Sequence, residues 1–152
     1  MESVRKISNS CPFCDNGNLS IRLIYKDALV MAFPTNIPIT PGHSLVCPAR
    51  HIAKIDDLST EEIVAIKSLI IKLKVSLKKC LGAEGFNIAW NEGETAGQSV
   101  GHLHIHVVPR TTGDTGICGY DPRKFLYRPG SRDISPDQEL QEVSELIKLN
   151  LK

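Results

Sequence analysis

In the N-terminal third of the chain, hydrophobic residues occur in short runs that polar residues separate. This pattern predicts β-strands. Residues 21–25, 28–33 and 43–47 are such runs. Lys26 and Asp27 separate the first two, as expected of a hairpin. Three prolines within residues 34–42 exclude a central strand there, because proline lacks the N–H that a ladder needs. We therefore expect a stiff loop before the third strand.

The longest periodic segment, residues 59–80, predicts an amphipathic helix. Ser59 and Glu62 fit a capping box, in which each side chain bonds the other residue's backbone N–H. One face should pack on a sheet, because apolar residues recur at intervals of three and four: Ile63, Ile66, Ile70, Leu73 and Leu77. A second amphipathic segment, at about residues 135–149, predicts a C-terminal helix.

Residues 86–90 and 99–108 predict two further strands that pair with each other. Residues 110–135 have no clear period and predict a long loop or an ordered arm, and residues 1–10 predict a loose lead-in. Together, these strands and helices predict an α+β fold in a single domain over residues 1–152. We expect an antiparallel sheet of about five strands, with the long helix on one face, and a C-terminal helix.

Composition and charge narrow the class of protein. The chain has 152 residues, of which 41% are hydrophobic and 23% charged, which is ordinary for one soluble domain. Eighteen Lys+Arg against seventeen Asp+Glu leave a net charge of +1, so no overall field favours nucleic acid or an anionic membrane. No apolar run approaches the ~18 residues of a membrane helix. We expect a cytoplasmic protein with no nucleic-acid or membrane partner.

Three of the five histidines, His102, His104 and His106, occupy alternate positions. On a strand they share one face, while the three intervening apolar residues share the other. At a rise of ~3.3 Å per residue the outer two lie ~13 Å apart, so one metal ion cannot bind all three. The row must divide its roles, unless it is simply a solvated face.

The residues just before this row of histidines have the chemical groups that bind phosphate. Gly97 allows a close approach of the backbone, and Gln98 and Ser99 offer an amide and a hydroxyl to phosphate oxygens. The same residues also fit a polar turn. Because neutral imidazole is a competent nucleophile toward phosphorus, the combination favours phosphoryl or nucleotidyl transfer.

These residues resemble a known family. The run Gln-Ser-Val-Gly-His-Leu-His-Ile-His-Val-Val, residues 98–108, is similar to the signature of the histidine triad (HIT) superfamily. Residues 41–48, Arg50 with His51, and Asn91-Glu92-Gly93 stand at the order and spacing of that family, so the resemblance covers roughly residues 11–110. It implies a HIT-like fold and a nucleotide hydrolase or transferase.

The resemblance also implies roles for single residues. His104 would attack the α-phosphorus of a nucleotide and form a nucleotidyl-histidine that water then cleaves. His106 would contact the phosphate and the leaving-group oxygen, with Ser99 near the leaving group. Gln98 and Asn91 would bind phosphate oxygens.

Two further positions carry alternatives. Where the family places an acidic or amide side chain near the ribose, the best alignment puts Thr35, with Asn36 next to it. His43 stands at a matching family position and either supports the site through hydrogen bonds or is purely structural.

Family relatives often form dimers through the long helix and the sheet edge, so we expect a homodimer, although an amphipathic helix would look the same in a monomer.

The resemblance implies two different classes of substrate. Residues 108–114 resemble the dinucleoside polyphosphate hydrolases, which implies cleavage of a diadenosine tetraphosphate type of substrate with release of AMP. Residues 91–93 and the cysteine pair are common in phosphoramidase-like branches, so adenosine 5'-monophosphoramidase activity is the alternative. Nucleotidyl transfer and non-catalytic nucleotide binding remain further alternatives. Four basic residues could reach a polyphosphate tail or form a solvated arm: Arg123, Lys124, Arg128 and Arg132.

A metal site is predicted beside the nucleophile. Cys11 and Cys14 form a C-x-x-C pair, which favours zinc over redox chemistry. Structural zinc takes four ligands, and His51 and His102 are available. This set resembles the branch that includes galactose-1-phosphate uridylyltransferases. We therefore expect a structural Zn2+ on Cys11, Cys14, His51 and His102 and no organic cofactor; empty thiols or a disulfide are the alternatives.

Overall fold

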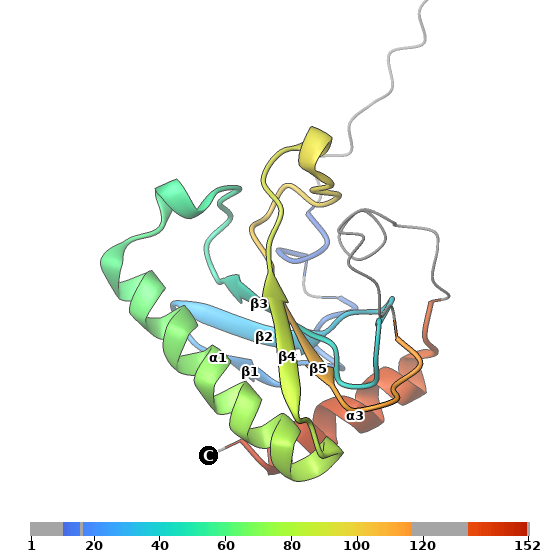
Figure 1. Cartoon of the computed structure of the whole chain (residues 1–152). Coiled ribbons are helices and arrows are strands. Elements are labelled where there is room, and N and C mark those ends of the chain that lie inside the picture. Colours follow the sequence, from blue (N-terminus) through green and yellow to red (C-terminus); the bar gives the residue numbers. More distant parts are fainter. Residues whose placement is uncertain (1–10, 16, 117–133, 152) are drawn as a thin grey trace, which may run out of the picture.

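A five-stranded antiparallel sheet forms the centre of the computed structural model, which describes residues 11–15, 17–116 and 134–151 (Figure 1). The strands lie in the order β1-β2-β3-β5-β4. Their bounds are β1 Tyr25–Lys26, β2 Val30–Pro34, β3 Ser44–Pro48, β4 Gly85–Ala89 and β5 Ile105–Arg110. The helices are α1 Thr60–Leu81 and α3 Asp137–Leu149, and the 3-10 turns are Ile55–Asp57 and Glu94–Ala96. The predicted α+β class and both helices are confirmed.

The ends of α1 follow from local chemistry. Ser59 Oγ accepts the N–H of Glu62 at 3.1 Å, and the Glu62 carboxylate accepts the N–H of Ser59 at 2.9 Å. The predicted capping box is therefore present. Arg50 adds an ion pair to the same carboxylate at 2.8 Å. Gly82 ends the helix in the left-handed region, at φ +67°, which glycine adopts without steric cost.

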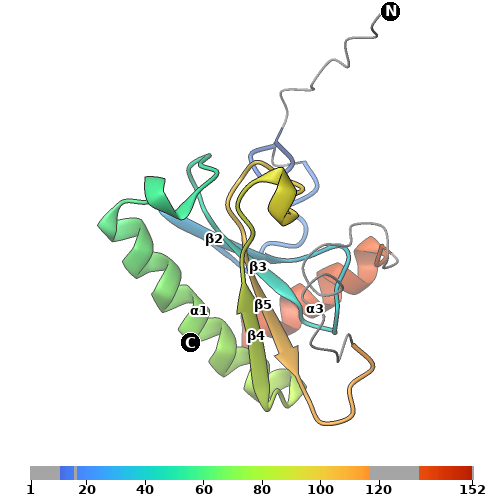
Figure 2. The same cartoon turned by 45° about the horizontal axis from the view of Figure 1, so that its top comes forward.

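The two faces of the sheet have different coverings. Helices α1 and α3 pack on the same face, where Leu73, Leu77 and Ile147 join Val46 and Val107 of the strands (Figure 2). The N-terminal segment covers the opposite face, where a second apolar cluster contains Phe13, Leu19, Met31, Phe33, Leu45 and Cys47. The rings of His102 and His104 lie against Phe13 on this second side.

One residue of the predicted helix face is placed differently. Ile63 is 48% exposed, although its spacing with Ile66 predicted burial. The buried stripe of α1 runs through Ile66, Leu69 and Leu73 instead. Because Ile63 sits beside this stripe and not within it, an apolar strip of α1 remains uncovered.

Two predicted strands are shorter than expected. Of the first run only Tyr25 belongs to β1, which continues through Lys26 to the turn, where Asp27 accepts the N–H groups of Leu29 and Val30. The last strand begins at Ile105 and not near residue 99. Leu103 donates its N–H to Ile52 O at 2.7 Å, so residues 101–104 leave the ladder to meet the loop after β3. His102 and His104 therefore precede the strand.

Some expectations fall outside the described residues. The predicted lead-in 1–10 does, and so does most of the predicted arm, including Arg123, Lys124, Arg128 and Arg132. Within the residues that the structure describes, neither helix is both long and apolar enough to cross a membrane.

Candidate active site and metal centre

Four predicted metal ligands converge at one end of the histidine row. The donor atoms of Cys11, Cys14, His51 and His102 all lie within 4.8 Å of one another. Cys14 Sγ lies 3.3 Å from His51 Nδ1 and 3.4 Å from His102 Nδ1, and Cys11 Sγ lies 3.6 Å from His102 Nδ1. A tetrahedral zinc ion with ordinary bond lengths separates sulfur and nitrogen ligands by about 3.5 Å. The donor set therefore fits zinc in type and in spacing.

His102 is oriented for this site by a backbone group. Its Nε2 donates to Pro48 O at 2.8 Å, so in the neutral ring the lone pair stands on Nδ1, which faces the two thiols. The side chain is fully buried, and burial lowers the pKa of His102 below its usual value. A neutral ring with its lone pair toward two sulfurs is the form that binds a metal ion.

The ring of His104 is oriented through the other nitrogen, Nδ1. Its Nδ1 donates to the carbonyl oxygen of His102 at 2.8 Å, so the neutral ring carries its lone pair on Nε2. Burial lowers the pKa of His104, and the hydrogen bond to His102 offsets this only in part. The ring is therefore neutral at pH 7, with the free electron pair that a nucleophile requires.

His106 takes its orientation from His43. Ile39 donates its N–H to His43 Nδ1 at 3.0 Å, so neutral His43 carries its proton on Nε2. That Nε2 lies 2.9 Å from Nδ1 of His106, which then accepts and leaves the His106 proton on Nε2. His43 is buried, and this hydrogen bond joins it to the histidine row. His106 presents an N–H of the kind that donates to phosphate or a leaving-group oxygen.

The loop before the row is braced by Gln98. Its Oε1 accepts the Gly93 N–H at 2.8 Å and its Nε2 donates to Ala53 O at 3.1 Å. The amide that the sequence suggested for phosphate thus joins two loops in this structure. Ser99, the next residue, is exposed. Asn91 is buried and donates to Gly97 O at 3.4 Å.

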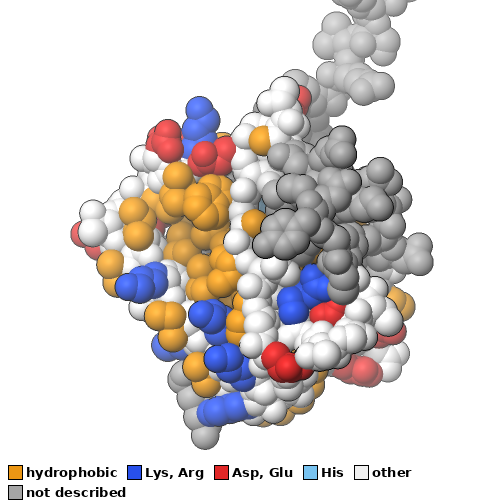
Figure 3. Space-filling model, viewed as in Figure 1, with side chains coloured by type: hydrophobic (Ala, Val, Ile, Leu, Met, Phe, Trp, Pro, Cys, Tyr) orange, Lys and Arg blue, Asp and Glu red, His pale blue; other side chains and the backbone are white. Residues whose placement is uncertain are grey.

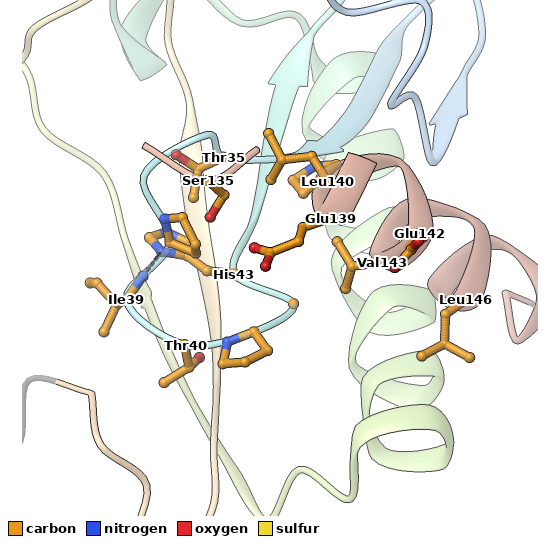
Figure 4. Close-up of a pocket in the computed structure, with 14 residues that line it drawn as sticks. Thr35, Ile39, Thr40, His43, Ser135, Glu139, Leu140, Glu142, Val143 and Leu146 are labelled. Atoms are coloured by element: carbon orange, nitrogen blue, oxygen red, sulfur yellow. Dashed lines mark hydrogen bonds between the residues drawn. The ribbon is translucent and has the colours of Figure 1, made fainter. Parts of the chain in front are cut away.

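Thr35 and Asn36 line different cavities. Thr35 is buried and borders a cavity of about 480 Å³ between the loop after β2 and α3, whose lining includes His43 but neither His104 nor His106 (Figure 4). In the close-up, Glu139 and Leu140 of α3 face that loop. Asn36 is exposed and borders a cavity of about 350 Å³ together with polar residues that include Arg22.

Sequence reasoning gave no role to Phe13, yet this side chain touches the row at two points. Its ring centroid lies 5.8 Å from that of His102 and 5.3 Å from that of His104, edge to face in both cases. The signal in the sequence is its place between Cys11 and Cys14, two of the predicted metal ligands. A bulky apolar side chain at that place must turn away from the ion.

Comparison with known proteins decides the family. The HIT domain matches residues 16–113, which is more than half of the chain. The chain belongs to the HIT family. An uncharacterized HIT-like protein of Methanocaldococcus jannaschii is 39% identical over 136 residues, covering 88% of this chain and 98% of its own.

Two curated HIT enzymes of Schizosaccharomyces pombe are also similar. Adenosine 5'-monophosphoramidase is 34% identical over 145 residues, covering 94% of this chain and 99% of its own. The asymmetrical bis(5'-nucleosyl)-tetraphosphatase is 34% identical over 93 residues, covering 61% of this chain and 51% of its own. The HIT family thus includes nucleotide hydrolases.

A solved HIT structure bears on both the fold and the metal. A zinc-bound histidine triad family protein from Mycobacterium smegmatis matches with a TM-score of 0.70 and 30% identity, covering 93% of each chain. The predicted HIT-like fold is confirmed. Together with the cluster of two cysteines and two histidines, the zinc-bound relative suggests zinc in this chain.

Proposed function

We propose that this HIT protein hydrolyses a nucleotide at its α-phosphorus through a nucleotidyl-histidine intermediate on His104. The observation that carries the proposal is the hydrogen bond from His104 Nδ1 to His102 O, which leaves the lone pair on Nε2 of a buried, neutral ring. Nε2 forms a bond to phosphorus while the bond to the leaving group breaks. Water then attacks the same phosphorus, breaks the N–P bond and releases the nucleoside monophosphate.

The neighbouring residues would assist this displacement. His106 would donate its Nε2 proton toward the phosphate or the departing atom, and the hydrogen bond from His43 supports that tautomer. Ser99 would stand near the leaving group and Asn91 near the phosphate. The two bonds of the Gln98 amide support a positioning role for Gln98, because they hold the loop that carries Ser99.

We further propose that Cys11, Cys14, His51 and His102 hold a structural zinc ion. Their spacing and the His102 tautomer support this assignment. With four protein ligands no position is open for water, so the ion would join residues 11–14 to the segment before β5. Metal analysis of the purified protein tests this: one zinc per chain is expected, and none in a Cys14→Ser variant.

The leaving group decides between two substrates. Dinucleoside polyphosphates come first, since residues 108–114 resemble that branch and the tetraphosphatase is a relative. Adenosine phosphoramidate is the second candidate, because the monophosphoramidase matches almost the whole chain. Both reactions would release AMP from the same intermediate.

One experiment tests the chemistry and the choice of substrate. The wild type and His104→Ala are each given diadenosine tetraphosphate and adenosine phosphoramidate, and the products are separated by chromatography. We expect AMP from the wild type alone, and the faster substrate identifies the leaving group. An active His104→Ala variant would refute the mechanism. Inactivity of both proteins, with AMP still bound, would favour a binding or transfer function.

We also propose that two copies associate through α1 and the edge strand β4. Ile63 and Ile71 of α1 are 48% and 51% exposed, and Ile88 and Trp90, on and just after β4, are 42% and 41% exposed. Hydrophobic side chains gather between α1 and β4 (Figure 3). Monomers rarely leave such a patch uncovered. Sedimentation should show a dimer for the wild type and a monomer for Ile71→Glu, whereas Leu149→Glu, on α3, should remain dimeric.

A further inference from the structure

We propose that Phe13 is a positioning residue that transmits the state of the metal site to His104. Occupancy of the site would then set the rate of the chemical step as well as the stability of the fold. This inference rests on the proposed function, in which His104 is the nucleophile. It assigns the linking role to one apolar side chain.

The first support is the place of the ring. The Phe13 centroid lies 5.8 Å from His102 at an interplanar angle of 73° and 5.3 Å from His104 at 74°. The side chain is buried and also packs against Phe33 at 5.2 Å. One ring therefore stands against both a metal ligand and the nucleophile.

The second support is how the ring is held. Phe13 lies between two ligands in a turn, where Cys11 O accepts the N–H groups of Cys14 and Asp15 at 3.1 and 2.9 Å. With both thiols turned toward His51 and His102, the intervening ring turns the other way, into the apolar cluster. A metal ion on the thiols would fix the ends of this turn and thereby the ring. Without the ion, the ends of the turn lose this link, and what holds the turn is its two hydrogen bonds, the thiol contacts and the packing of Phe13 in the apolar cluster.

The third step concerns His104 itself. The hydrogen bond to His102 O fixes where Nδ1 sits, and the direction of Nε2 then depends on the rings of Phe13 and His106 that pack against His104. The edge-to-face packing of Phe13 limits the tilt of the ring and so fixes the direction of Nε2. Misplacing a reacting atom by about 1 Å can cost about 10²-fold in rate. Loss of the metal should therefore lower kcat more than it raises KM.

The test combines removal of the metal with substitution of the Phe13 side chain, in the manner of a double-mutant cycle. Wild type, Phe13→Ala and Met31→Ala are each assayed with zinc bound and after chelation, with zinc content, circular dichroism, kcat and KM recorded. Met31 is the control, because it belongs to the same apolar cluster but lies on β2, which β3 separates from β5 and the histidine row.

We expect chelation to lower the wild-type kcat about tenfold or more, with KM within about twofold. Zinc-loaded Phe13→Ala should hold a full complement of zinc, already show the lowered kcat, and lose less than about twofold more on chelation. Met31→Ala should respond as the wild type does. Equal losses on chelation in wild type and Phe13→Ala would overturn the proposal, as would a wild-type kcat that is independent of zinc.

Two further measurements cover other outcomes. If chelation unfolds the protein, zinc-loaded Phe13→Leu and Phe13→Ala decide: a graded fall in kcat at constant KM supports the proposal, and an unchanged kcat overturns it. If the wild type is inactive on both nucleotides, the ring signals of His104 in NMR still report the coupling. Zinc removal should shift those signals in the wild type but much less in Phe13→Ala, and equal shifts would overturn the coupling separately from the proposed activity.

Discussion

His102 and His104 stand two residues apart, are both buried, and each give one ring nitrogen to a backbone carbonyl, yet they face different partners. His102 uses Nε2 on Pro48 O and turns Nδ1 toward two thiols. His104 uses Nδ1 on His102 O and keeps Nε2 for another atom. The backbone oxygen that each ring reaches decides which nitrogen carries the lone pair. Two identical side chains can thus take a metal role and a nucleophilic role.

Replacing His104 should break the catalytic half of this comparison and leave the metal half intact. We expect His104→Ala to lower kcat by about 10⁴-fold or more, because no other group in the proposed mechanism can form the covalent bond. Zinc content should stay at one per chain. Rapid-quench measurement of AMP release checks the rate, and metal analysis checks the site. A residual rate within 100-fold of the wild type would show that another group attacks.

Replacing His102 should break the metal half of the comparison and, through the loss of zinc, also lower kcat. His102→Ala removes a ligand, so we expect zinc content to fall to near zero. A metal that binds only the native state stabilises it by about 4 kcal/mol when free metal is 1,000 times Kd. The melting temperature should then fall by roughly 10 °C. Cys80→Ala, at a half-buried thiol outside the cluster, is the control and should keep its zinc. A zinc-replete His102→Ala protein would contradict the ligand assignment.

A third variant tests whether His106 depends on a neighbour as His102 and His104 depend on carbonyls. His43→Phe removes the donor to His106 Nδ1 and with it the preference for a proton on Nε2. We expect kcat to fall about 10- to 100-fold, the usual cost of losing a partner that orients a functional histidine. His43→Gln keeps a donor and should lose less. Steady-state assays of both variants settle the point, and equal losses would argue for a purely structural His43.

The convergence of the cysteine pair on His51 and His102 was predictable, because it depends on alternation and on residue types. His102, His104 and His106 share a side in any extended conformation, and a C-x-x-C pair needs two more ligands. The capping box of α1 was predictable for the same reason, since Ser59 and Glu62 act on their own backbone. Local chemistry of this kind is written in consecutive residues.

Contacts between distant segments were not predictable. The bond from Leu103 to Ile52 takes residues 101–104 out of the ladder, so that the strand begins only at Ile105, and no residue type near position 103 indicates this bond. The amide of Gln98 reaches Ala53, 45 positions away, so its bracing role was hidden. Phe13 was overlooked because apolar residues next to cysteines are common in loops, and only the fold brings its ring to His104.

The smallest predicted effect separates the two histidines by pH. Burial lowers the pKa of His104, and the proposed attack needs the neutral ring. We therefore expect kcat/KM to stay level as pH falls to about 6.5, the usual histidine pKa, and to decline only below it. Between the native pKa and about 6.5 the unfolded chain binds the proton and the native protein does not, so the free energy of unfolding also falls as pH decreases. His104→Asn should weaken that slope. Urea titrations at several pH values test this expectation. Zinc content is measured at each pH, because protonation of His102 would release the metal and lower stability in step with zinc release. A profile that declines already above pH 7 would contradict the buried, neutral nucleophile.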